Sequence, residues 1–147
     1  MIIHLSQFLA TLATILFTGA AIYINLAEHP ARMACGVELA ATVFGPSYKR
    51  AAKMQVILAL IATIAGVVSW LMDGGRMWLL GTLVILAVIP FTLIAIMPTN
   101  KRLLDPGLDR RSEATLDLLQ KWGKLHALRS ILSLIASLIF LSLVMGA

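Results

Sequence analysis

The sequence predicts an all-α membrane protein, a four-transmembrane-helix bundle with a short interfacial helix after the first span. Two observations predict this fold class. Of the 147 residues, 60% are apolar and 13% are charged, far from the composition of soluble globular domains. Four apolar segments each approach the ~20 residues that cross about 30 Å of hydrocarbon. We expect one membrane domain, residues 1–147, with spans over about residues 5–28, 47–72, 78–98 and 112–146.

The first span is expected to end near His29, because Pro30 disfavours the α conformation in the residue before it. Residues 31–44 then predict the short helix in the membrane interface. The tripeptide Gly45-Pro46-Ser47 is typical of a turn. Pro46 suits the first turn of a helix, where its missing N–H is not needed. The second span is therefore expected to begin at residue 47.

The middle of the chain predicts a helical hairpin. Residues 73–76, Asp-Gly-Gly-Arg, form its tight turn, with Trp70 and Trp78 at the depth of an interfacial aromatic belt. Pro90 predicts a kink in the third span, which is expected to close at Pro98.

The last part of the chain predicts one long helix. Ser112 or Asp109 can cap its N-terminus, and no proline follows before Ala147. At 1.5 Å per residue this helix is about 50 Å long. Its first part is a cytoplasmic extension, and its second part is the fourth span.

The basic residues predict the orientation. Of the 12 Lys and Arg residues, all but Arg76 lie in or beside the connections between spans one and two and between spans three and four. By the positive-inside rule, both connections are cytoplasmic and both termini face outside. We expect a multi-pass integral membrane protein, in the inner (plasma) membrane if the cell is bacterial. The net charge of +5 follows from this asymmetry and does not indicate nucleic acid; the lipid bilayer is the expected partner.

The single cysteine, Cys35, allows no intramolecular disulfide. It falls on the predicted cytoplasmic side, where thiols stay reduced. We expect it to be a small buried side chain.

A polar stripe follows one face of the first span. Its members recur at steps of three and four, which places them on one side of a helix. Polar groups that face lipid without partners cost on the order of 2–7 kcal/mol each, so the stripe is expected to face inward. The stripe consists of His4, Gln7, Thr11, Thr14, Thr18, Ala21, Asn25, Glu28 and Arg32.

The last helix has a second polar row at the same spacing: Trp122, His126, Arg129, Ser133 and Ser137. The charged ends of both rows and the end of the third span lie at one membrane depth. Ionisable groups at such a depth indicate a functional site. We therefore predict a polar pocket near the cytoplasmic face, made by Asn25, Glu28, His29, Arg32, Asn100, Trp122, His126 and Arg129.

Three segments resemble the anthrone oxygenase-like family of small four-helix membrane proteins. They are Tyr-Ile-Asn-Leu-Ala-Glu-His-Pro-Ala-Arg (Tyr23–Arg32), Pro-Thr-Asn-Lys-Arg-Leu (Pro98–Leu103) and Trp122-x-x-x-His126-x-x-Arg129. Some members of this family act in polyketide pathways, where O2 oxidises an anthrone to an anthraquinone without a recognised cofactor. The resemblance implies the same class of reaction here.

Our first hypothesis is therefore a membrane oxygenase or oxidoreductase that acts with O2 on a lipophilic aromatic, anthrone- or quinol-like substrate, with no cofactor. His126 or His29 is the expected base, Arg129 and Arg32 would hold the developing oxyanion, and Trp122 would stack on the ring. The candidate catalytic residues are His126, His29, Glu28, Arg129 and Arg32. The candidate substrate-binding residues are Asn25, Tyr23, Asn100 and Trp122.

Two alternatives stay open at this point. A metal or haem site would use His29, His126 and Glu28, although Glu28 and His29 are adjacent and point about 100° apart on a regular helix. A structural or accessory membrane protein would use the cluster only to pack the bundle. In that case Glu28 would pair with Arg129 or Arg32. The sequence is also compatible with a homo-oligomer.

Overall fold

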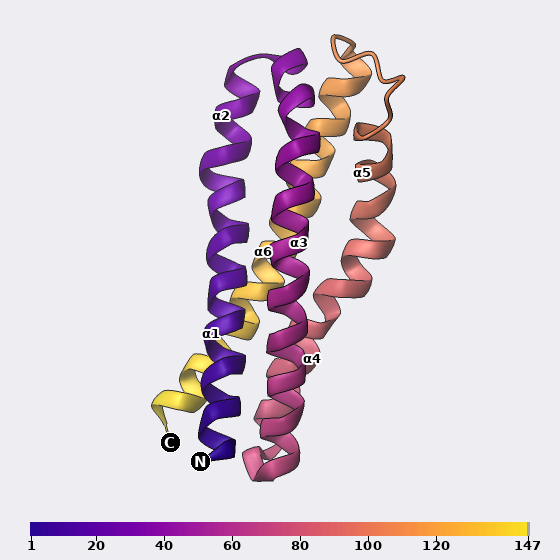
Figure 1. Ribbon diagram of the computed structural model, residues 1–147. Coiled ribbons are helices and arrows are strands. Elements are labelled where there is room, and N and C mark those ends of the chain that lie inside the picture. Colours follow the sequence, from indigo (N-terminus) through magenta and orange to yellow (C-terminus); the bar gives the residue numbers. More distant parts are fainter. Residues whose placement is uncertain (147) are drawn as a thin grey trace.

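The computed structural model describes residues 1–146, with the backbone alone for Asp73 and Gly74. It is all-helical over these residues. Figure 1 shows long helical rods side by side in an elongated bundle. Four continuous rods are long and apolar enough to cross a membrane. They are Ile2–Ala34, Val37–Met72, Gly75–Leu103 and Glu113–Met145. The four-helix membrane architecture predicted from the sequence is thus confirmed.

The first rod does not stop at Pro30. Helix α1 (Ile2–Tyr23) passes through a π-helical turn, Ile24–Glu28, into α2 (His29–Ala34). Pro30 lies in the first turn of α2, and the widened turn before it accommodates the missing N–H. The polar residues Asn25 and Glu28 belong to this turn.

The expected interfacial helix over residues 31–44 is not confirmed. The chain reverses at Cys35 and Gly36, and Gly36 adopts a φ of 97° that favours glycine. Helix α3 (Val37–Ser69) then runs without a break through Pro46. Pro46 has no N–H to donate, so the carbonyl of Thr42, four residues earlier, lacks its helical hydrogen bond. Both Pro46 and Thr42 are exposed residues at the polar end of the bundle. Water can therefore bond that carbonyl, and the proline costs the helix little.

The third rod bends near its middle. Helix α4 (Gly75–Phe91) contains Pro90 and continues through a π-helical turn, Thr92–Ile96, into α5 (Met97–Leu103). Figure 1 shows the rod turning away from α3 at this point, as the proline predicts. The helix continues past Pro98, because a proline in the first turn of α5 needs no N–H.

The last rod is a single helix, α6 (Glu113–Met145), as predicted. The cap is Ser112, whose hydroxyl accepts the backbone N–H of Thr115 at 3.2 Å. Before it, Arg111 reaches across to α3 with two hydrogen bonds to the Glu38 carboxylate, at 2.9 and 3.0 Å. These bonds raise the pKa of Arg111 and hold the loop at residues 104–112 against α3.

Small residues let the rods approach closely in the lower half of the bundle. Several alanines of α1 and α3 form an apolar core with Phe17, Ile85 and Phe140. Gly81 allows Phe140 to pack on α4, since a Cβ there would lie 2.6 Å from the ring. Close packing of small residues is the usual way in which membrane helices associate.

Trp78 corrects the predicted aromatic belt. It is buried and stacks on Phe140, with ring centroids 5.2 Å apart, whereas Trp70 is partly exposed. The sequence places both next to the hairpin, but Trp78 falls on the inner face of α4.

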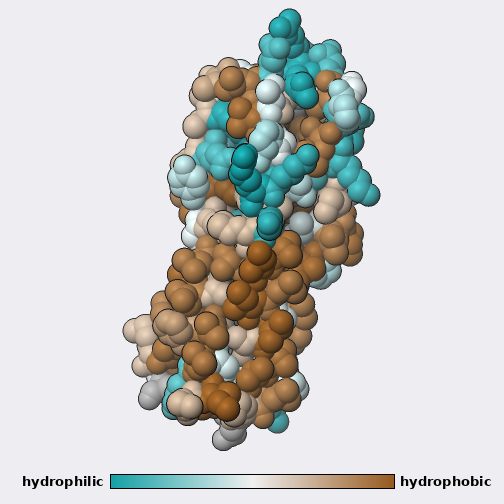
Figure 2. Space-filling view, viewed as in Figure 1, coloured by the Kyte–Doolittle hydropathy of each residue, from teal (hydrophilic) through white to brown (hydrophobic). Residues whose placement is uncertain are grey.

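Both termini and the α3–α4 turn lie at one end of the bundle, and the α2–α3 turn and the α5–α6 loop lie at the other (Figure 1). Figure 2 shows hydrophilic side chains gathered over the upper end, which carries the α2–α3 turn and the α5–α6 loop, and hydrophobic side chains over the lower part. The polar ends of the rods are therefore on one side of the apolar band.

Candidate functional site

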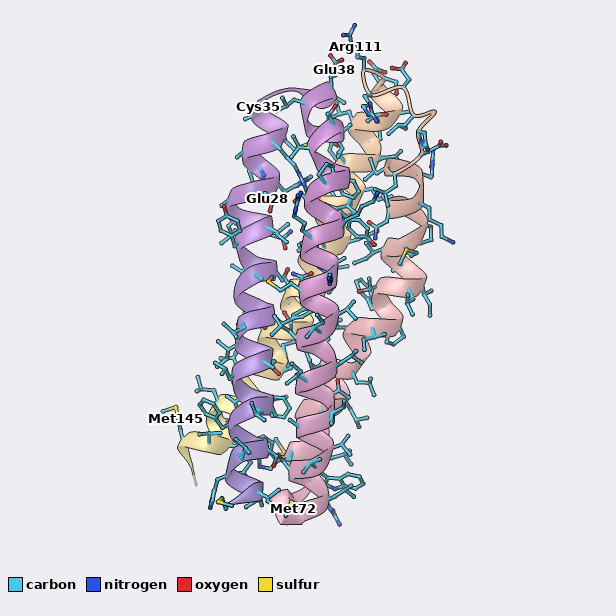
Figure 3. The ribbon with its side chains drawn as sticks, in the orientation of Figure 1. Glu28, Cys35, Glu38, Met72, Arg111 and Met145 are labelled. Carbon is cyan, nitrogen blue, oxygen red and sulfur yellow. The ribbon has the colours of Figure 1, made fainter. Side chains whose placement is uncertain are left out.

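The polar side chains of all four rods converge in the upper half of the bundle. Figure 3 places Glu28 there, below the turn at Cys35 and far from Met72 and Met145 at the other end. The residues form two linked groups, one around His126 and Arg129 of α6 and one around Arg32 of α2.

His126 is at the centre of the first group. Its Nδ1 is 2.7 Å from Oδ1 of Asn25, and its Nε2 is 2.6 Å from Nη2 of Arg129. Asn25 is oriented by its own amide N–H, which donates to the Gly123 carbonyl, and by the Ser130 hydroxyl, which donates to the same Oδ1. Because Oδ1 only accepts, Nδ1 carries the proton and Nε2 accepts from Arg129.

Arg129 carries a positive charge inside the bundle. It is 9% exposed, and its Nη2 donates to Oε1 of Gln55 at 2.7 Å as well as to His126. The guanidinium carbon lies 5.6 Å from the centre of the Phe17 ring. Among residues with described side chains, no carboxylate lies within ion-pair distance of Arg129. Its charge is thus free to attract an anion.

Arg32 is the centre of the second group. Its guanidinium lies over the rings of Trp122 and Phe44, at 5.0 and 5.4 Å. Its Nε donates to Nδ1 of His29 at 3.2 Å. The cation is therefore held against aromatic faces as well as by hydrogen bonds.

Glu28 pairs with Arg32, 3.5 Å away, and not with Arg129 or a histidine. It also accepts a hydrogen bond from the Ser47 hydroxyl of α3. The ion pair lies within the first rod, and the hydrogen bond from Ser47 joins that rod to α3.

Trp122 lies between the two groups. Its indole N–H donates to Oδ1 of Asn100 at 2.8 Å, and its ring contacts His126 and His29 at centroid distances of 4.7 and 5.2 Å. Arg32 lies over the ring as well. Trp122 thus organises the site, and it also lines the small cavity.

Four buried donor groups in this region have no hydrogen-bond partner. They are Nη2 of Arg32, Nε2 of Gln55, Nδ2 of Asn100 and Nε of Arg129. The four residues are at most 9% exposed, and all line one small cavity of about 20 Å³, enough for one water-sized molecule. Buried donors of this kind are normally satisfied, so the cavity is suited to a group that accepts hydrogen bonds.

A larger cavity of about 220 Å³ adjoins the small one. The two share Tyr48, Ala52, Gln55 and Arg129. The rest of the larger cavity is almost wholly apolar and lies between α3 and the bend at Pro90. Its wall residues Val56, Leu60 and Leu93 are about half exposed on the outside of the bundle, on the surface that faces lipid. We call it the apolar slot; its inner end is Gln55 and Arg129.

The structure brings together most of the residues predicted for the pocket, and it corrects one of them. Tyr23 is 61% exposed and points away from the site, because it lies two positions before Asn25, about 200° around the helix from that member of the stripe. The residues brought together are Asn25, Glu28, His29, Arg32, Asn100, Trp122, His126 and Arg129.

Several residues of the site were missed by the sequence analysis. Gln55 is an amide within an apolar span, a signal that could have been noticed. Ser130 follows His126 by four positions and so shares its face. Gly123 carries no side-chain signal, yet a Cβ there would lie 2.7 Å from Nε2 of His29. Ser47 was assigned to a turn, and Tyr48 was expected in the second span without a role in the site.

The three candidate metal ligands do not form a ligand cluster. Among the described residues, no group of three or more His, Cys, Asp or Glu side chains could hold a metal ion. Glu28 binds Arg32 and Ser47, and both ring nitrogens of His126 are bonded to protein groups.

The fold and the site define a class of protein: a multi-pass membrane protein with a buried cationic pocket at the inner end of an apolar slot. The family model for anthrone oxygenase matches residues 44–139, more than half of the chain. The chain therefore belongs to the anthrone oxygenase family. No curated protein matches it, and no solved structure does. The matched region contains Gln55, Asn100, Trp122, His126 and Arg129, whereas the first rod lies outside it.

Proposed function

We propose that this protein is an integral membrane oxygenase that oxidises a lipophilic aromatic substrate, anthrone- or quinol-like, with O2. One observation carries the proposal: the apolar slot, open towards lipid, ends at the charged and donor-rich pair Arg129 and Gln55. A polycyclic substrate dissolved in the bilayer would enter the slot with its rings and place its oxygen at this pair. The family membership supports the same class of reaction.

The proposed reaction balances without a further reductant. An acidic C–H of the anthrone loses a proton, and the resulting enolate gives one electron to O2. The carbon radical and superoxide combine to a hydroperoxide, which loses water to give the second carbonyl of the quinone. Anthrone and O2 thus become anthraquinone and water.

The side chains have distinct roles in this proposal. Arg129 holds the developing oxyanion, and Asn100 and Arg32 offer further unpartnered donors to it. When the substrate oxygen accepts the N–H of Arg129, Nε2 of His126 is released and can take the proton. His29 is the less suitable base, because its Nδ1 already accepts from Arg32 behind Trp122.

The basic residues also support an orientation with both long connections in the cytoplasm and both termini outside. The pocket then lies near the cytoplasmic face. The lipid bilayer, the lipophilic substrate and O2 are the proposed partners.

The test is O2 uptake by detergent-purified protein supplied with anthrone, with anthraquinone measured as product. We expect turnover by the wild type and a loss of about 100-fold or more for Arg129→Gln, the cost of removing one preorganised donor to an oxyanion. Arg50→Gln is the matched control, because Arg50 is an exposed arginine of α3 outside both cavities. Absence of turnover with anthrones and quinols alike would favour a structural or accessory protein.

The proposal invokes no resident metal or haem. Metal analysis and the visible absorption spectrum of the purified protein test this directly. We expect no stoichiometric metal and no haem band. A stoichiometric metal or a haem band that disappears in His126→Ala would replace the proposal with a metal- or haem-binding redox protein.

A further inference from the structure

We infer that the pocket binds its ligand through an ionised oxygen, and so selects the phenolate or enolate form of an acidic lipophilic aromatic over the neutral form. This inference deepens the proposed function, and it rests on that function only for the aromatic character of the ligand. It concerns binding in the ground state, before any oxidation.

The first argument is the excess of donors. The buried polar atoms without partners around the small cavity are all N–H groups, from Arg32, Gln55, Asn100 and Arg129. An ionised oxygen has only lone pairs and can accept several of these hydrogen bonds at once.

The second argument is that the acceptors are already in use. Oε1 of Gln55 accepts from Arg129, Oδ1 of Asn100 accepts from Trp122, and Nε2 of His126 accepts from Arg129. A neutral phenol would bring one more donor into a site whose principal acceptors are occupied. A buried donor without a partner is costly, so the neutral form is disfavoured.

The third argument is charge. The titratable groups that line the cavity are Arg32 from the first rod, Tyr48 from α3, and His126 and Arg129 from α6. Glu28 and His29 contact Arg32 without lining the cavity, and the third rod contributes the neutral Asn100 and Ile96. Glu28 compensates Arg32, whereas no described carboxylate pairs with Arg129. One buried positive charge therefore remains, in surroundings where charges interact strongly.

The position of Arg129 determines which part of the ligand meets this charge. Arg129 and Gln55 supply the buried N–H donors in the wall that the apolar slot and the small cavity share, which also includes Tyr48 and Ala52. A planar aromatic that fills the slot therefore directs its oxygen to these donors, while its rings remain among apolar side chains.

The experiment uses 4-nitro-1-naphthol, a probe without the acidic C–H of an anthrone, whose phenolate absorbs at longer wavelength than the phenol. Its ionisation is titrated in detergent micelles with and without an excess of the wild-type protein. We expect the midpoint pH to fall by at least one unit in the presence of protein, which means at least tenfold tighter binding of the phenolate. In Arg129→Gln most of this shift should disappear. In Arg50→Gln, which lowers the net charge equally, the shift should persist.

A second measurement needs no variant. The methyl ether of the same probe cannot ionise, and at a pH above the midpoint it should bind wild-type protein at least tenfold more weakly than the naphtholate. An unchanged midpoint, an equally tight ether, or a shift that Arg50→Gln also abolishes would overturn the inference. These outcomes are independent of turnover. O2 uptake without a shift would refute the inference and leave the proposed function standing, and a shift without O2 uptake would do the reverse.

Discussion

At His126 the two ring nitrogens have different roles, and this decides what a substitution does. Nδ1 donates to Asn25, and Nε2 accepts from Arg129. The imidazole thus fixes the direction of a cation and of an amide from another rod. The sequence presents His126 as a candidate base. The structure shows that it also positions Asn25 and Arg129.

We expect His126→Ala to lower turnover of anthrone by about 100-fold or more, the usual contribution of a positioned acid or base. His4→Ala is the control, since His4 lies at the opposite end of the first rod. Steady-state O2 uptake measures both, with helical content by circular dichroism to show that each variant folds. Wild-type rates in the His126 variant would remove this residue from the mechanism.

Gln55 is expected to contribute to stability as well as to binding. Gln55→Leu removes the acceptor of one Arg129 hydrogen bond, and a buried charged donor left without its partner costs about 1–3 kcal/mol. Denaturation in detergent should show the loss, and the KM for anthrone should rise. Gln7→Leu makes the same chemical change in a partly exposed part of α1 and should leave both values unchanged; equal losses in the two variants would refute this role.

At the scale of the helices, the crossing of the first rod and α6 depends on Gly123. The His29 ring lies where a Cβ of residue 123 would be, 2.7 Å from Nε2. Because Arg32 holds that ring from the other side, the ring has little room to move. The close approach of these two helices is what allows Asn25 to reach the Gly123 carbonyl.

We expect Gly123→Ala to destabilise the protein by about 1–3 kcal/mol, the range for overpacking a filled interface. Gly19→Ala is the matched control in α1, because nothing lies within 4 Å of a Cβ built there. That change should be neutral or stabilising by up to about 1 kcal/mol, since alanine is the better helix former. Thermal unfolding of the two variants separates the effects, and equal stabilities would contradict the packing argument.

At the scale of the whole molecule, the orientation in the membrane can be tested with a native probe. Cys35 is the only cysteine, and it lies exposed in the α2–α3 turn, which corrects the expectation that it is buried. Its position at the upper end of the bundle makes it a reporter for that end.

We expect a membrane-permeant maleimide to label Cys35 in intact cells and an impermeant one to leave it unlabelled, because the orientation proposed from the positive-inside rule has this turn in the cytoplasm. In the double variant Cys35→Ser/Arg76→Cys, the impermeant reagent should label the new thiol at the other end. The opposite pattern in both proteins would invert the proposed orientation.

The sequence by itself determined the number of spans, the long last helix and most of the pocket, because hydropathy and helical spacing are local properties. Asn25, Arg32, His126 and Arg129 were found from their steps of three and four. Only the tertiary structure decided which partner each side chain takes, for example that Glu28 binds Arg32. It also decided that Trp78 is buried and Cys35 exposed, the opposite of what was expected for each, and that Gln55 completes the site. It also decided that residues 31–44 form no separate helix, since the cost of Pro46 depends on which way the freed carbonyl faces. The Glu28–Arg32 pair is local, at positions i and i+4, but the choice of Arg32 over Arg129 depends on how the rods pack. The other properties also depend on contacts between rods distant in sequence, which no local pattern encodes.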